Sequence, residues 1–266
     1  MKIDYRIKKV LLQCLIKAGH YIAQSMYRIE SIQYKSEINL VTEVDKNAEQ
    51  MILDLIQKNF NNHGILAEES EPKTGISYKW IIDPLDGTTN YVHTFPMSVV
   101  SIACERDGVL IMGGVYDPFR KELFFAEKGR GAFLNQKRIC VSTTKTLAKS
   151  LLVTGFPYDN REYADYYLKF VKGFMLKCQG FRRTGSAAMD LCYVACGRFD
   201  GFWEMKLKPW DTAAGQLIVQ EAGGYISNFT GKEYSIYKPE ILATNKRIHQ
   251  EMLKLMKPLL KKNHIK

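Results

Sequence analysis

The strongest constraint on the fold is an apolar run that ends in two closely spaced carboxylates. Residues 80–90 read Trp-Ile-Ile-Asp-Pro-Leu-Asp-Gly-Thr-Thr-Asn, so a hydrophobic strand delivers Asp83 at its end and Asp86 follows three residues later. Both side chains leave the same turn and can converge on one hard divalent cation such as Mg²⁺, which prefers oxygen ligands. Gly87 lets the backbone approach an anion, and the amides after it would point at that anion from a helix N-terminus. A Pro-Asp-Gly turn whose aspartates cap a helix explains the same residues.

Further acidic positions favour the metal interpretation. Glu68 and Glu69 close the apolar run 65–67, Asp45 follows another apolar stretch, and Asp211 stands at a predicted helix start. Each is explained separately by a helix N-cap or by a solvated loop acid. Together with residues 80–90 they describe four acid-bearing strand or helix ends, which is the pattern of a site for several metal ions. The five histidines show no ligand spacing, so zinc is not expected.

Hydrophobic spacing predicts a mixed α/β chain. We expect helices at 3–30, 46–59, 161–177, 186–197, 211–222 and 246–259, and strands at 65–67, 80–82, 97–105, 109–116, 121–126, 150–154, 199–203 and 240–243. The chain is long enough for one domain made of two packed halves, about 1–145 and 146–266, with a cleft between them.

The net charge of +10 is confined to the two ends of the chain. Residues 1–35 and residues 254–266 each carry a net charge of +5. A solvated helix face and a tail explain this most simply, and weak attraction to nucleic acid is the alternative. A nucleic-acid- or protein-binding module is therefore the second hypothesis.

The sequence is typical of a cytoplasmic protein. Six widely spaced cysteines, with no Cys-x-x-Cys pair, are expected to be reduced core residues. No apolar run reaches the roughly 18–20 residues that a membrane helix needs, so no membrane association is expected.

Two long segments resemble the signatures of the inositol monophosphatase family. Residues 80–90, continuing through Tyr91 and 95–98, resemble the first signature, and residues 210–215, leading to 221–224, resemble the second. Supporting matches lie at residues 40–42, 67–70, 185–188 and 197–201, so the resemblance covers roughly residues 5–255. It implies the layered αβαβα sandwich of the sugar-phosphatase superfamily and a homodimer.

The resemblance implies a phosphomonoesterase that holds two or three Mg²⁺ ions. The implied metal ligands are the side chains of Glu68, Asp83, Asp86 and Asp211 and the carbonyl of Leu85. In such a site one ion lowers the pKa of the attacking water and another stabilises the leaving alkoxide.

The resemblance also assigns the residues around the metals. Asp45, Glu68 and Thr88 form the catalytic set, in which Thr88 and Asp45 orient the water, and Glu69 supports the geometry. The implied substrate contacts are Asp86, Gly87, Thr88, Gly185, Ser186, Ala187, Glu204 and Asp211, with Glu204 as the polyol-binding carboxylate. Arg182 and Arg183 face either phosphate or a subunit interface.

The expected substrate is a small phosphate ester, with inositol monophosphate favoured by Glu204. Fructose 1,6-bisphosphate, histidinol phosphate and a nucleotide phosphate remain as alternatives, because one fold serves many substrates. A nucleotide would need aromatic or basic contacts, and the sequence alone does not place them.

Overall fold

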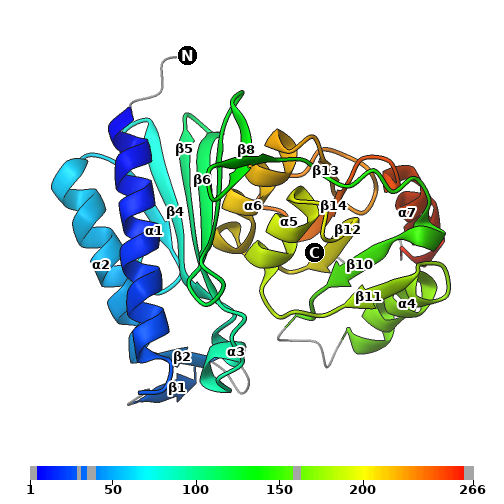
Figure 1. Cartoon of the computed structure of the whole chain (residues 1–266), viewed down its shortest axis with the longest axis horizontal. Helices are drawn as coiled ribbons and strands as arrows, with labels where there is room; N and C mark the ends of the chain where they lie inside the picture. The colour runs from blue at the N-terminus through cyan, green and yellow to red at the C-terminus, as the bar shows by residue number, and fades with distance from the viewer. Residues whose placement is uncertain (1–4, 29–30, 35–39, 158–162, 261–266) are drawn as a thin grey trace.

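The computed structural model describes residues 5–28, 31–34, 40–157 and 163–260. Its layers alternate between helices and sheets, as Figure 1 shows. Two N-terminal helices, α1 (Tyr5–Ser25) and α2 (Glu43–Asn59), cover the outer face of the first sheet. Helices α5 (Ala187–Ala195) and α6 (Pro209–Glu221) fill the space between the first sheet and the second. On the far side of the second sheet lie α4 (Ala164–Met175) and α7 (His249–Met256).

The first sheet is mostly antiparallel. Its strands, in spatial order, are β3 (Gly64–Ala67), β4 (Tyr78–Asp86), β5 (Val99–Arg106), β6 (Val109–Asp117), β7 (Glu122–Glu127), β8 (Gly131–Leu134) and β9 (Lys137–Ile139). Only the β3–β4 pair is parallel among these described strands, so the chain mostly returns by tight connections.

The second sheet is mixed. Its spatial order is β11 (Gly180–Arg182), β10 (Leu151–Thr154), β12 (Gly201–Met205), β14 (Glu240–Thr244) and β13 (Tyr225–Ser227). Strand β10 runs parallel to both of its neighbours, whereas β14 runs antiparallel to both of its own. The remaining described elements are the ribbon of β1 (Ile32–Tyr34) and β2 (Leu40–Thr42), the short helix α3 (Thr88–Val92), and two 3₁₀ turns, Leu147–Lys149 and Lys257–Leu259.

Small residues let the middle helices pack closely against the first sheet. A Cβ atom at Gly113 on β6 would lie 2.9 Å from the Cα of Ala214 on α6. Between the two middle helices, a Cβ at Gly215 would lie 2.6 Å from the Cβ of Leu191. These backbones are therefore too close for larger side chains, which fixes the start of α6 relative to the sheet.

The layered α/β architecture confirms the expected fold class. All of the long helices and strands that the sequence predicts are present, with ends shifted by a few residues. The predicted strand 80–82 is longer than expected and runs from 78 to 86. The helix start expected after Gly87 is present as α3, and the apolar stretch before Asp45 is β2. The sequence did not predict the short strands β1, β8, β9, β11 and β13, because three or four residues give little periodicity. The division into halves at 145/146 stays a prediction.

The cysteines follow the expectation only in part. All six are free, and Cys14, Cys104 and Cys192 are buried as core residues. Cys140 is exposed, so the core assignment was wrong there. No helix within the described ranges is long and apolar enough to cross a membrane.

The first residue of α7 predicts a pH dependence of stability. His249 is buried, its Nε2 lies 2.9 Å from the hydroxyl of Ser227 and its Nδ1 lies 2.9 Å from that of Thr244. Burial lowers its pKa from 6.5 to about 4, so the folded chain keeps the ring neutral where the unfolded chain is protonated. The stability that the buried neutral ring of His249 gives the fold is fully present above pH 6.5. It is lost as the pH falls toward 4, and the free energy of unfolding then decreases by no more than about 1.4 kcal/mol per pH unit.

Urea unfolding of the wild type and of His249→Gln at pH 7 and pH 5 checks this expectation. The free-energy difference between the two proteins should shrink by about 2 kcal/mol at pH 5. An equal difference at both pH values would contradict it.

Candidate active site

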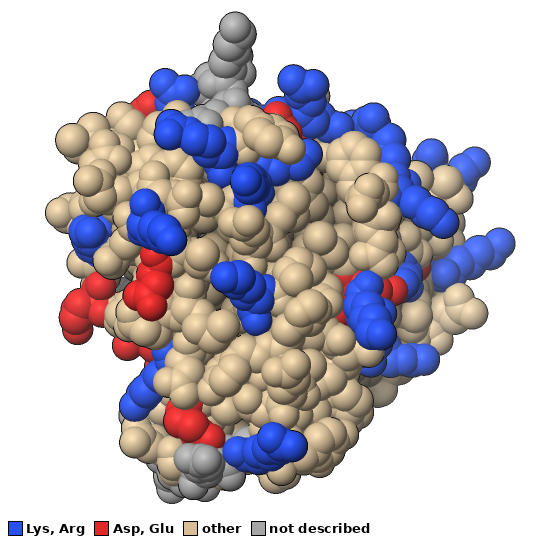
Figure 2. All heavy atoms as spheres, turned by 60° about the vertical axis from the view of Figure 1, so that its left-hand side comes forward, with Lys and Arg blue, Asp and Glu red and all other residues tan. Residues whose placement is uncertain are grey.

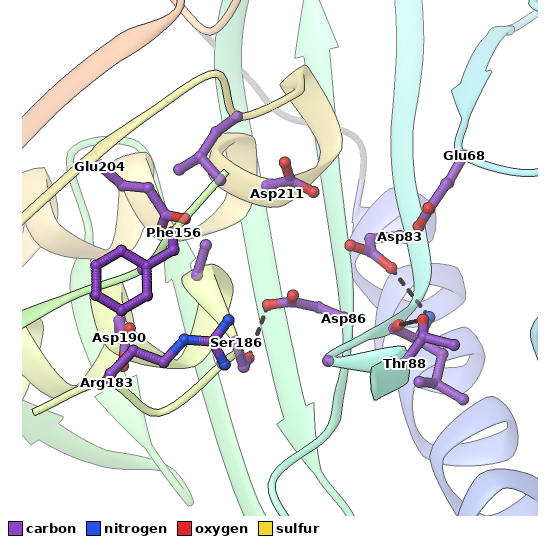
Figure 3. A pocket seen from close by; sticks show the side chains of 16 residues that line it. Glu68, Asp83, Asp86, Thr88, Phe156, Arg183, Ser186, Asp190, Glu204 and Asp211 are labelled. Atoms are coloured by element: carbon purple, nitrogen blue, oxygen red, sulfur yellow. Dashed lines mark hydrogen bonds between the residues drawn. The ribbon is translucent and has the colours of Figure 1, made fainter. Parts of the chain in front are cut away.

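A small acidic pocket of about 90 Å³ lies where the ends of β4, β12, α5 and α6 meet. Its lining residues are Glu68, Asp83, Leu85, Asp86, Gly87, Thr88, Gly155, Phe156, Arg183, Gly185, Ser186, Ala187, Asp190, Glu204, Leu207 and Asp211. In the described part of the chain this lining contains six carboxylates and one guanidinium. Figure 3 shows the carboxylates of Asp83, Asp86 and Asp211 around one space, with Glu68 on one side and Glu204 on the other.

Eleven of the thirteen site residues that the sequence predicts line this pocket in the part of the chain that the structure describes. Asp45 and Glu69 do not line it. Asp45 lies behind Thr88, and the amide of Glu69 donates to the carboxylate of Glu49 on α2 at 2.9 Å. Both therefore stand one residue away from the pocket surface.

A bulge in β4 turns Asp83 and Asp86 to the same side. In a regular strand, residues three apart point to opposite faces. Here Asp83 pairs with Ser101 and Asp86 pairs with Val99, so three steps on β4 match two on β5. The amide of Leu85 donates to Asp83 Oδ1 at 3.0 Å and holds this turn.

Gly87 begins α3 in a conformation that other residues rarely adopt. Its φ is 91°, and a Cβ there would lie 2.7 Å from the carbonyl oxygen of Met97. The sharp turn places Thr88 at the pocket wall, where it is 9% exposed. The Thr88 hydroxyl lies 3.1 Å from Asp45 Oδ1 and 3.1 Å from the Leu85 carbonyl oxygen, and can donate to either.

Asp45 combines a helix cap with its contact to Thr88. Its Oδ2 accepts from the amide of Thr42 at 2.8 Å and from the Thr42 hydroxyl at 2.5 Å. Its backbone amide donates back to the Thr42 hydroxyl at 3.4 Å, which completes a capping box at the start of α2. Its Oδ1 is directed at Thr88. Burial raises the pKa of Asp45, and the nearby charge of Glu69 adds to that rise.

Asp211 is placed by the start of α6. Its Oδ2 accepts from the amide of Lys208 at 2.6 Å, and Pro209 occupies the first turn. The alternative prediction that Asp45 and Asp211 are helix N-caps is therefore nearly right. Each aspartate accepts from the N-cap amide, but it stands at the third helical position rather than at the N-cap itself.

Asp86 connects the two sheets. Its Oδ2 accepts from the hydroxyl of Ser186 at 2.7 Å and from the amide of Ala188 at 2.8 Å, both at the start of α5. Burial raises the pKa of Asp86 to about 6, and Glu68 adds to the rise while these hydrogen bonds oppose it. The first signature region is thus attached directly to the C-terminal part of the chain.

The other pocket carboxylates are strongly perturbed. Burial raises the pKa of Asp83 well above its ordinary value, and repulsion from Glu68, Asp86 and Asp211 raises it further. The pKa values of Asp211 and Glu204 are raised in the same way, first by burial and then by neighbouring carboxylates. A cation placed among these oxygens would oppose that repulsion, and an all-oxygen donor set suits a hard ion such as Mg²⁺.

The described side chains do not form a closed metal cage. Within the part of the chain that the structure describes, no three His, Cys, Asp or Glu side chains stand close enough together to hold an ion as they are. The pocket therefore offers oxygen ligands from several elements without a complete coordination shell of its own.

Sequence reasoning missed several residues of the pocket. Asp190 is buried on α5, where it accepts from the hydroxyl of Thr184 at 2.5 Å. Its signal was present, because an acid inside the apolar run Ala-Ala-Met-Asp-Leu-Cys needs a buried partner. Gly155, Phe156 and Leu207 carry no such signal and arrive through the tertiary fold. Arg183 lines the pocket, which agrees with the first of its two proposed orientations.

The five-layer fold and the all-oxygen pocket define the class of layered α/β sugar-phosphatase-type proteins. The particular family follows from comparison with known proteins. The model of the inositol monophosphatase family matches residues 5–260, and the chain belongs to that family. The family resemblance of the two signature regions is thereby confirmed.

Individual relatives agree with this assignment but carry two different names. The chain is 46% identical over 248 residues to a Synechocystis protein named inositol-1-monophosphatase, covering 92% of this chain and 86% of that one. It is 45% identical over 245 residues to an Escherichia coli protein named Nus factor SuhB, covering 91% and 92%. The crystal structure of extragenic suppressor protein suhB from Bartonella henselae superposes with a TM-score of 0.91 at 37% identity, covering 95% of this chain and 98% of that one.

Proposed function

We propose that this protein is a Mg²⁺-dependent phosphomonoesterase that hydrolyses inositol monophosphate to inositol and phosphate. Family membership supports a phosphatase, and the Synechocystis relative bears the name of this activity. The observation that carries the proposal is the hydrogen bond from Thr88 to Asp45 beside a pocket of converging carboxylates. It puts a proton acceptor next to oxygen ligands for a metal.

Each group in the pocket has a proposed role. Glu68, Asp83, Asp86 and Asp211 would hold Mg²⁺ with the carbonyl of Leu85, and the bound ions would supply Lewis-acid activation of water and of the leaving oxygen. The Leu85 carbonyl has two lone pairs, so contact with Thr88 does not prevent it from being a ligand.

The protein's own groups would then position the reactants. Asp45 would accept a proton through the Thr88 hydroxyl as the water attacks. The amides of Gly87 and Thr88 would donate to phosphate oxygens, whose negative charge grows in the transition state.

The far side of the pocket suits a polyol. Glu204 and Asp190 offer carboxylate oxygens, and the start of α5 offers small residues at Gly185 and Ala187. Because carboxylates accept hydrogen bonds from hydroxyl groups, this wall would favour an alcohol rich in them. Glu204 would thereby select inositol over simpler alcohols.

Phosphate release from inositol, sugar and nucleotide phosphates, with Mg²⁺ and with chelator, tests the proposal. Mg²⁺-dependent release confined to inositol monophosphates is the expected result. Release only from fructose 1,6-bisphosphate, histidinol phosphate or a nucleotide would retain the chemistry and overturn the substrate. No release from any ester would overturn the enzyme assignment.

A substitution at Gly155 tests the polyol wall. A Cβ at this position would collide with the carboxylate of Glu204, which must then move. Gly155→Ala should lower kcat/KM for inositol 1-phosphate by about 10- to 100-fold, because displaced contacts misalign the substrate. The loss on p-nitrophenyl phosphate, which has no polyol, should be smaller.

Gly180→Ala is the matched control. A Cβ at Gly180, on β11, would lie 3.6 Å from the Leu151 side chain, which is an ordinary contact distance. If both alanine variants lose the same activity on both esters, the wall has no role in selecting the polyol.

We propose a homodimer as the assembly, on the strength of the family resemblance alone. Sedimentation or light scattering at micromolar concentration tests it, with a species of twice the 30.6 kDa chain mass as the expected result. A monomer at all concentrations would overturn it.

A second candidate function is nucleic-acid or protein binding. It is favoured by the distribution of charge and by the Escherichia coli relative, which is named Nus factor SuhB rather than as a phosphatase. Helix α1 carries Arg6, Lys8, Lys9 and Lys17 and no acidic residue. Figure 2, with the α1–α2 side turned forward, shows many Lys and Arg side chains among fewer acidic ones.

Binding of the full chain to RNA at increasing salt, compared with a chain trimmed of residues 254–266, tests this candidate. Of that tail, residues 261–266 lie outside the described residues. Weaker binding with a shallower salt dependence in the trimmed chain is expected, since basic residues release counterions from phosphates. Absence of RNA binding by the full chain would contradict it.

A further inference from the structure

The carbonyl oxygen of Gly87 accepts two hydrogen bonds. One comes from the amide of Tyr91 in α3, at 3.0 Å. The other comes from the hydroxyl of Ser98, the residue directly before β5, also at 3.0 Å. Because a carbonyl oxygen has two lone pairs, these donors use both of them and fix the direction in which the carbonyl points.

The same peptide unit carries the amide of Thr88. A trans peptide is planar, so its C=O and its N–H point in opposite directions. A donor that fixes the carbonyl of Gly87 therefore also fixes the direction of the Thr88 N–H. This is one of the two amides that we propose to contact the phosphate of the substrate.

Ser98 lies behind the wall of the pocket. It is 0% exposed, and it is absent from the pocket lining in the described part of the chain, whereas Gly87 and Thr88 both belong to that lining. The hydroxyl thus meets the carbonyl on the buried side of the peptide. The N–H on the opposite side of that peptide is then directed toward the pocket.

The segment that carries Ser98 is itself held in place. The Nδ2 of Asn90, on α3, donates to the carbonyl of Met97 at 2.8 Å. The guanidinium of Arg120 donates to the carbonyl of Pro96, also at 2.8 Å. The Ser98 hydroxyl is therefore presented by a segment that is braced on the two preceding residues.

A hydrogen bond to a carbonyl also strengthens the donor at the other end of the same peptide. Hydrogen bonds in a chain polarise one another, so a bonded carbonyl makes the N–H a better donor. In phosphate-ester hydrolysis the negative charge on the phosphate oxygens grows in the transition state, where a preoriented donor stabilises it most. Loss of this orientation should therefore lower kcat more than it raises KM.

We propose that Ser98 is a positioning residue that aims the Thr88 amide at the phosphate group of the substrate. The inference rests on the proposed phosphomonoesterase activity. Ser98 does not touch the substrate and acts through the peptide between Gly87 and Thr88. Its effect belongs to the phosphate, which all the candidate esters share, and not to the alcohol.

Ser98→Ala tests this role, because it removes the hydroxyl and keeps the Cβ. With Mg²⁺ present, kcat should fall about 10-fold, less than when an oxyanion donor is lost outright, since the Thr88 amide remains. KM should rise by less than about threefold, because the gain from orientation is realised mainly in the transition state. The losses should be equal for inositol 1-phosphate and p-nitrophenyl phosphate.

Ser150→Ala is the matched control. Ser150 is also 0% exposed and also donates its hydroxyl to a backbone carbonyl, that of Thr146 at 2.8 Å, but neither residue lines the pocket. Both alanine variants should unfold at a slightly lower urea concentration than the wild type, since each loses one buried hydrogen bond. Only Ser98→Ala should lose turnover.

Three results would overturn the role of Ser98 while the phosphatase stands. They are an unchanged kcat in folded Ser98→Ala, a loss confined to the inositol ester, and an equal loss of turnover in Ser150→Ala. If the wild type hydrolyses neither ester, the proposed function itself fails and this inference fails with it.

Discussion

Asp83→Asn should abolish Mg²⁺-dependent phosphate release while leaving the fold intact. Asp83 is 1% exposed at the bulge of β4, and its carboxylate faces the same space as those of Asp86 and Asp211. Metal ions contribute several kcal/mol of transition-state stabilisation, so losing a proposed metal ligand should lower kcat by about 10³-fold or more. Asparagine keeps the carbonyl oxygen that accepts from the Leu85 amide, so the local turn is preserved.

The same substitution should stabilise the metal-free fold. The pKa of Asp83 is raised in the folded chain, so the folded state binds the Asp83 proton more tightly than the unfolded state does. The stability that this gives is present at low pH and is lost as the pH rises above 3.8, the ordinary pKa of an aspartate. At pH 7 a neutral side chain relieves the repulsion, and the free energy of unfolding in chelator should rise by about 1–2 kcal/mol. Mg²⁺ should raise the Tm of the wild type but not that of the variant.

Asp200→Asn separates this effect from the loss of a buried carboxylate elsewhere. Asp200 is also buried, but its oxygens accept from the hydroxyl of Ser142 and the amide of Leu151, away from the pocket. That variant should lose stability and keep its response to Mg²⁺. Near-normal turnover in Asp83→Asn, or an unchanged Mg²⁺ shift of Tm, would refute the metal assignment.

The first signature region shows what sequence can and cannot predict. The apolar run and its two carboxylates were enough to predict a strand that ends in a site. The convergence of the two side chains was predicted from a shared turn after the strand, but β4 instead continues to Asp86, where a regular strand would separate them. The bulge that unites them is defined by pairing with Ser101 and Val99 on β5, and such pairing is not visible in local sequence.

The far side of the pocket was harder to predict for a related reason. Phe156 follows β10, and Asp190 lies on α5, so neither is near the signature regions in sequence. The start of α5, which carries Asp190, is attached to Asp86 by Ser186 and Ala188 across about 100 residues of chain. The family resemblance supplied Glu204 and the start of α5, whereas local patterns alone gave only separate acidic positions.

Thr88→Val should lower kcat by about 10²- to 10⁴-fold, the range attributed to a positioned proton-transfer group. Valine has the shape of threonine but lacks the hydroxyl that lies 3.1 Å from both Asp45 Oδ1 and the Leu85 carbonyl. KM should change little, because the backbone amide proposed to contact phosphate is retained. The cost to folding should be about 1 kcal/mol, as for one buried hydrogen bond.

Thr88 tests the proton path better than Asp45 does. Asp45 also accepts from the amide and the hydroxyl of Thr42, so changing it would damage the start of α2 as well. Thr88→Ser restores a hydroxyl at the same position and should recover most of the activity, which a purely structural role for the threonine methyl would not allow. If the valine variant keeps wild-type kcat, or if serine fails to rescue it while both proteins remain folded, then the hydrogen bond from residue 88 to Asp45 has no part in activating water.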